Sequence, residues 1–165
     1  MPGDVRSLIR GQEHYGPGHF FLAPHAPHFP LQAPEADIRR YRDRFADGWD
    51  AARDRKWRRM RRMGLINCSL APLEPNMWTR WNTPDAELLA KVGAGEVARA
   101  VPWTSLTPEQ KSFQRTKMAI HAAMITRMDL EIGKVLDQVE AMGAARDTVV
   151  IFLSDNGASS EQLIR

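Results

Sequence analysis

The sequence has little cysteine and no long hydrophobic run. Cys68 is the single cysteine among 165 residues, so the chain can form neither an internal disulfide nor a zinc site built from several cysteines. Residues 1–18 mix charged residues with glycine and proline and contain no apolar core of a signal peptide. No apolar run is long enough to span a bilayer. We expect a soluble chain without a signal peptide, and its compartment stays open.

A strong excess of one charge is also missing. The chain has 23 basic and 20 acidic residues, a net charge of +3, which is too small for the whole chain to be interpreted as a nucleic-acid or membrane binder. At 43% hydrophobic residues it can bury the core of one ordinary domain. We expect no nucleic-acid partner and no membrane partner, and the oligomeric state stays open.

The part of the chain before residue 105 has the pattern of three helices. Ile38, Tyr41 and Phe45 recur at helical spacing and predict a short helix after Pro34. A second helix is predicted from Asp47, as the N-terminal cap, to a stop at Gly64. Within the Pro- and Gly-rich region 67–105, only a short helix near 87–92 is predicted.

The most regular pattern predicts one long helix over 108–142. Thr107, Pro108 and Gln110 resemble a capping box with proline at the first helical position. Apolar residues then recur at helical spacing until Gly143, which is placed to end the helix.

Two short apolar runs predict buried strands. Residues 148–153 form a continuous β-branched and apolar run, typical of a strand buried on both faces, and 19–23 form a second run. Helices alternating with such strands indicate the α/β class, with a parallel or mixed sheet flanked by helices. We predict a poorly determined tail over 1–17 and one domain over 18–165.

Polar residues follow the later strand at its carboxyl end. Asp155 and Asn156 offer hard oxygen donors suited to Ca²⁺ or Mg²⁺, and Gly157 allows a sharp turn. Open α/β sheets bind ligands at such strand ends. The tetrapeptide alone is also explained by a simple turn, because these residue types favour turns for conformational reasons.

The earlier run is followed by a proline-studded loop that contains His28. A histidine on a stiffened loop could present a ring nitrogen to an anion or to a leaving group. Considered by itself, His28 is more simply interpreted as a solvent-exposed loop histidine. The basic cluster over 53–62 could bind a polyanion, but a solvated helix face explains it more simply.

Cys68 has no basic neighbour in sequence, which favours a free structural thiol over a nucleophile.

Together these segments resemble the type I, formylglycine-dependent sulfatases. Residues 26–34, Ala-Pro-His-Phe-Pro-Leu-Gln-Ala-Pro, are similar to the family's APHxPLQAP loop, and 154–157, Ser-Asp-Asn-Gly, to its SDNG motif. The resemblance covers about 17–158 and implies part of an alkaline-phosphatase-like fold. It implies that His28 contacts the sulfate and protonates the leaving alcohol, and that Asp155 and Asn156 bind Ca²⁺.

The chain also departs from the family pattern. The C-x-P-x-R motif, whose cysteine becomes formylglycine, does not occur, because Cys68 lies in Cys-Ser-Leu-Ala-Pro. The family's early paired aspartates, which complete the metal site, are missing as well. The resemblance therefore implies a fragment of an enzyme that hydrolyses small sulfate esters or sulfated glycans, inactive alone. The alternatives are a related phosphoesterase of the alkaline phosphatase superfamily, or a non-catalytic remnant that binds anions through the basic helix Arg53–Arg62.

Overall fold

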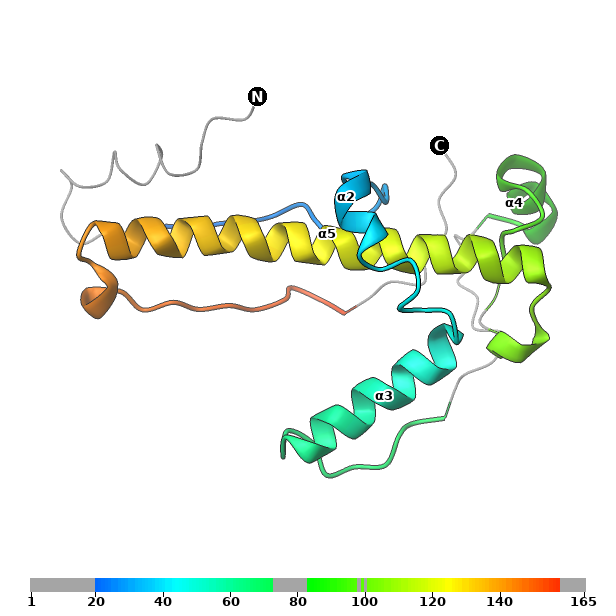
Figure 1. Ribbon diagram of the computed structural model, residues 1–165, viewed down its shortest axis with the longest axis horizontal. Helices are drawn as coiled ribbons and strands as arrows, with labels where there is room; N and C mark the ends of the chain where they lie inside the picture. Colours follow the sequence, from blue (N-terminus) through cyan, green and yellow to red (C-terminus); the bar gives the residue numbers. More distant parts are fainter. Residues whose placement is uncertain (1–19, 73–82, 98, 100, 158–165) are drawn as a thin grey trace.

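The computed structural model describes residues 20–72, 83–97, 99 and 101–157, and this part of the chain is helical (Figure 1). The predicted tail lies outside the described residues. The elements are, in order, α2 (Glu35–Arg39), α3 (Gly48–Arg62), α4 (Asp85–Val92), the 3₁₀-helix η2 (Trp103–Ser105), α5 (Pro108–Ala141) and the 3₁₀-helix η3 (Ala145–Asp147).

The long helix α5 confirms the prediction made from its caps. Gln110 N donates to Thr107 Oγ1 at 3.2 Å, and Thr107 N donates to Gln110 Oε1 at 2.9 Å, which completes the capping box. After α5, Gly143 adopts a φ of +72°, a conformation that glycine adopts without a steric penalty. With 34 residues, α5 is about 51 Å long and forms the axis of the molecule.

The shorter helices agree with the sequence in position but not in every detail. The helix α3 begins after Asp47 and ends before Gly64, as predicted, and Gly64 has a φ of +70°. The Asp47 side chain makes no capping hydrogen bond, because its carboxylate pairs with Arg55 instead. The helix α2 ends at Arg39 rather than near residue 45, because the following residues form turns with bonds three residues apart, such as Arg44 N to Tyr41 O.

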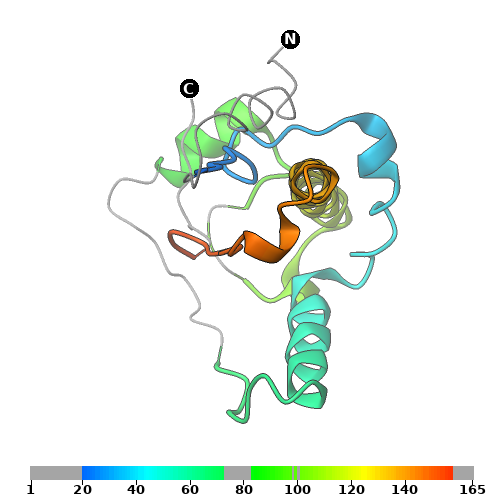
Figure 2. The same ribbon diagram turned by 90° about the vertical axis from the view of Figure 1, so that its left-hand side faces the viewer.

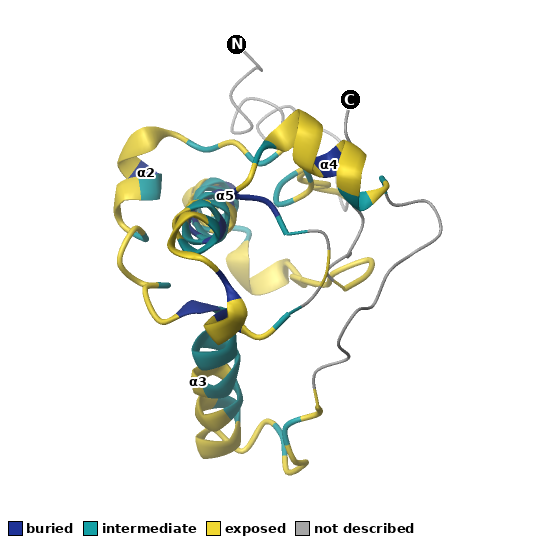
Figure 3. Ribbon diagram, turned by 90° about the vertical axis from the view of Figure 1, so that its right-hand side faces the viewer, coloured by how far each residue is buried: buried dark blue, intermediate teal, exposed yellow. Residues whose placement is uncertain are grey.

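Viewed along its axis, α5 lies at the centre and the other segments surround it (Figure 2). Ala123 is fully buried, and Ala119 and Met124 are nearly so. The helix α2 packs against α5. Most of the described residues are exposed or half-buried, and few are buried (Figure 3). Charged side chains recur along even the longest helix, and none of the described helices could cross a membrane.

The predicted sheet is not confirmed, since the described residues contain no β-strand. The prediction that 148–153 is buried is wrong for this chain, because Val149 is 86% exposed and Leu153 is 72% exposed. The prediction for 19–23 fails in the same way at Phe21, which is 79% exposed, while residue 19 lies outside the described residues. A strand buried on both faces needs neighbouring strands for its backbone and side chains, and no described segment supplies one.

The two apolar segments nevertheless share a direction. Residues 20–24 and 148–153 both run along the long axis in the same sense, opposite to α5 (Figure 1). Parallel strands of an α/β fold also share one direction. The described residues show this common direction but do not form a sheet.

Candidate functional site

The His28 loop is the first part of the candidate site. Its backbone turns tightly, with His28 N donating to His25 O at 3.0 Å, and the Ala26–Pro27 and Phe29–Pro30 peptide bonds are cis. The His28 side chain is exposed at this turn. The ring centroids of His25 and His28 are 5.4 Å apart, so a second imidazole accompanies the predicted one.

One nitrogen of the His28 ring has a fixed partner. Nδ1 lies 2.7 Å from the carbonyl oxygen of Phe29. A carbonyl oxygen only accepts, so Nδ1 must be the donor in this bond, and Nε2 is left for chemistry. The loop thus presents one nitrogen of a histidine to the outside.

The Asp155–Asn156 turn is the second part. Asn156 N donates to Asp155 Oδ1 at 3.0 Å, and Ser154 Oγ donates to the backbone carbonyl of Asn156. All three residues are exposed. One carboxylate oxygen already accepts a local hydrogen bond, as in the turn that the tetrapeptide alone predicts.

The described residues do not assemble these parts into a metal centre. They contain no group of three or more His, Cys, Asp or Glu side chains that could hold an ion. No hydrogen bond joins His28 to Asp155 or Asn156 in this part of the chain. Two side chains are too few for Ca²⁺, which takes six to eight oxygen ligands. The residues present have the right donor chemistry for a share of a calcium site, but they do not fit a complete one.

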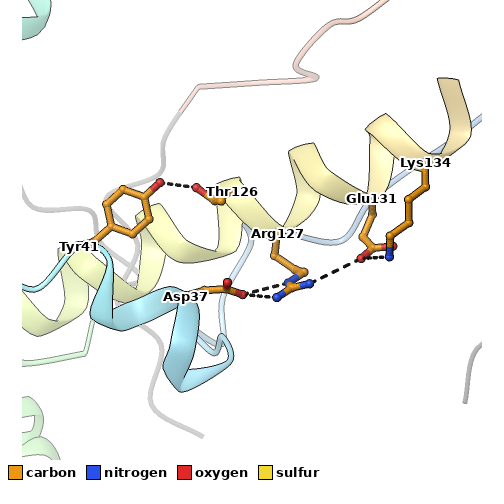
Figure 4. A network of polar contacts seen from close by, with 6 residues as sticks. All are labelled: Asp37, Tyr41, Thr126, Arg127, Glu131 and Lys134. Atoms are coloured by element: carbon orange, nitrogen blue, oxygen red, sulfur yellow. Dashed lines mark hydrogen bonds and ion pairs between the residues drawn. The ribbon is translucent and has the colours of Figure 1, made fainter. Parts of the chain in front are cut away.

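A polar network holds α2, and with it the chain leaving the His28 loop, against α5 (Figure 4). The guanidinium of Arg127 donates to Asp37 Oδ2 through Nη2 at 2.6 Å and through Nε at 3.0 Å. Tyr41 and Thr126 are joined by a hydroxyl–hydroxyl hydrogen bond. Asp37 is buried, so this charge needs its cation. Sequence reasoning did not predict these pairs, because no local pattern connects positions so far apart.

A second buried cluster lies near the start of α5. Glu96 accepts hydrogen bonds from Lys117 Nζ at 2.8 Å and from Gln114 Nε2 at 2.8 Å. Burial acts to raise the pKa of Glu96, but the bonds from Lys117, the Val97 N–H and Gln114 outweigh it, so the pKa lies below its ordinary value. Glu96 also lines a pocket of about 330 Å³ that contains none of the predicted site residues. We assign this cluster to stability.

The comparisons with known proteins agree with the motif loops. Residues 5–163 match the family model described as Sulfatase. The chain is 34% identical to an uncharacterized sulfatase of Schizosaccharomyces pombe (strain 972 / ATCC 24843) over 138 residues, which are 84% of this chain and 21% of that protein. It is 30% identical to an arylsulfatase of Klebsiella aerogenes over 158 residues, which are 96% of this chain and 29% of that protein.

This chain belongs to the sulfatase family. It spans between about a fifth and a third of the length of these two relatives. The matched range includes both the His28 loop and the Asp155–Asn156 turn. Family membership thus confirms the resemblance, while the roles of the individual residues stay predictions.

Proposed function

We propose that this chain is part of an enzyme that hydrolyses sulfate esters, with His28, Asp155 and Asn156 in its active site. The observation that carries the proposal is the placement of the two motif loops. Each follows an extended segment, and the two segments run in the same direction, opposite to α5 (Figure 1). In parallel α/β architecture, loops at the carboxyl ends of the strands lie at one edge of the sheet, where ligands bind.

The proposed role of His28 is to protonate the leaving alcohol. When the sulfur–oxygen bond of the ester breaks, the alcohol oxygen gains negative charge and takes a proton from Nε2. The bond from Nδ1 to Phe29 O keeps the other proton on Nδ1 and orients the ring. Histidine is the side chain that most often serves as a general acid or base.

The proposed role of Asp155 and Asn156 is to contribute two oxygen ligands to a Ca²⁺ ion. The bound ion would neutralise sulfate charge. The described residues do not complete such a site, so the remaining ligands would come from outside this part of the chain. The nucleophile must also come from elsewhere, because Cys68 lies outside the required motif.

The exposure of 148–153 supports the need for further polypeptide. Val150 is 62% exposed and Ile151 is 77% exposed, although both are side chains that proteins normally bury. Strands of the remaining sulfatase domain would pair with this segment and cover both of its faces. We therefore propose that the chain alone has no sulfatase activity.

A chimera tests the proposal directly. Residues 20–157 replace the matching segment of the Klebsiella aerogenes arylsulfatase, and hydrolysis of an aryl sulfate is measured with Ca²⁺ present. We expect turnover by the chimera and none by the chain alone. His28→Ala should lower kcat by about 10²- to 10⁴-fold. The matched control, His25→Ala, removes the neighbouring ring and should change kcat much less.

Two results would contradict the proposal. If the His28→Ala variant of the chimera keeps full activity, another group protonates the leaving alcohol. A chimera that cleaves an aryl phosphate faster than the aryl sulfate would instead favour the related phosphoesterases.

A further inference from the structure

The helix α3 projects from the rest of the molecule (Figures 1 and 2). Its first turn is anchored at η2, where the rings of Trp49 and Trp103 meet edge to face at 5.0 Å between centroids. Trp49 Nε1 also donates to Val101 O at 3.0 Å. Farther along, Trp57 Nε1 donates to Cys68 O at 3.1 Å, so the returning chain covers this side of the helix. The opposite side is open to solvent.

The carboxylates on and beside α3 are already engaged. Asp50 accepts from Trp103 N at 2.8 Å, and Asp54 pairs with Arg58 at 2.8 Å. Asp47 pairs with Arg55. The other carboxylate oxygen of Asp50 is buried without a hydrogen-bond partner, and within the described part of the chain no ion pair joins an acidic side chain to the remaining cations of α3.

Lys56, Arg59 and Arg62 are exposed, and their side chains make no ion pair or hydrogen bond within the described part of the chain. We call these three side chains the basic face of α3. At 100° per residue they fall within about 120° of the helix circumference, and at 1.5 Å per residue they span about 9 Å of its length. The same geometry puts Trp57 on the opposite side. The basic face is therefore a compact, unneutralised patch.

We propose that the basic face of α3 binds a sulfated polysaccharide. Guanidinium groups donate pairs of parallel hydrogen bonds to tetrahedral oxyanions, and an ammonium adds a point charge. The aromatic rings of α3 are already engaged, Trp57 on the opposite side with Cys68 O and Trp49 in the first turn with Trp103 and Val101 O, so neither is left to stack on bases. The choice of sulfate over other anions rests on the proposed function.

The test measures binding of the whole chain to a fluorescently labelled heparin-type polysaccharide at several salt concentrations. Three contacts should give a wild-type affinity that falls by roughly 20- to 40-fold between 50 and 200 mM salt. The variant Lys56→Gln/Arg59→Gln/Arg62→Gln should lose most of this dependence. The matched control, Lys111→Gln/Lys134→Gln/Arg146→Gln, removes the same charge elsewhere and should behave like wild type.

Three results would overturn the proposal. The two triple variants could lose the same affinity for the polysaccharide, the wild-type chain could bind a desulfated polysaccharide as tightly as the sulfated one, or it could bind duplex DNA more tightly than the sulfated polysaccharide. Circular dichroism of each variant shows whether the helices persist. The measurement involves no turnover, so its failure leaves the chimera result standing, and failure of the chimera leaves this binding result standing.

Discussion

Replacing Arg127 by methionine tests whether its ion pair with Asp37 holds α2 against α5. The carboxylate side chain of Asp37 is 8% exposed, whereas the Arg127 side chain is 44% exposed. The variant keeps much of the aliphatic volume of the arginine but leaves a buried carboxylate without its cation. Removal of one partner from a fully buried pair costs about 3–5 kcal/mol, and the exposure of Arg127 lowers this to about 2–3 kcal/mol here.

The measurement is the free energy of unfolding, from urea titrations followed by circular dichroism at 222 nm. A loss of about 2–3 kcal/mol corresponds to a fall in Tm of roughly 5–10 °C for a chain of this size. The matched control is Lys134→Met, which removes a cation from an exposed pair with Glu131 and should cost about 1 kcal/mol or less.

A double variant separates the charge effect from lost packing. If the buried charge is the cause, Asp37→Asn combined with Arg127→Met should be less destabilised than the sum of the two single variants. The reasoning is refuted if Arg127→Met costs no more than Lys134→Met, or if the two single losses simply add.

Two further predictions concern a glycine contact and a buried acid. Gly48 has a φ of +81°, and a Cβ there would lie 2.0 Å from Trp103 Cδ2, so Gly48→Ala should destabilise by about 1–3 kcal/mol and change the near-UV circular dichroism. Gly133→Ala is the control, because α5 has open space there, and it should stabilise by up to about 1 kcal/mol; similar losses in both would refute the steric argument. Because the pKa of Glu96 is lower in the folded chain than its ordinary value of 4.5, its stabilising effect is present above that pH and is lost as the pH falls through the folded value. Lys117→Met should flatten this dependence in urea titrations between pH 3 and 6, and an unchanged slope would contradict the assignment.

The sequence alone predicted the elements that depend on neighbouring residues. The start of α5 follows from Thr107 and Gln110, three positions apart, and its end from Gly143. The end of α3 follows from Gly64 in the same way, whereas the predicted cap at Asp47 gives the right position without the capping hydrogen bond. The two motif loops also sufficed to indicate the family, because their residue order is specific. Hydrogen bonds within one turn and backbone preferences of single residues act locally, so a linear pattern records them.

Only the tertiary structure decided which distant groups meet. The Asp37–Arg127 pair joins residues 90 positions apart, and Asp47 pairs with Arg55 rather than capping α3. The same reason explains why the expected strand at 148–153 stays exposed. A helix satisfies its own backbone hydrogen bonds, whereas a strand depends on neighbours, and the described part of the chain provides none.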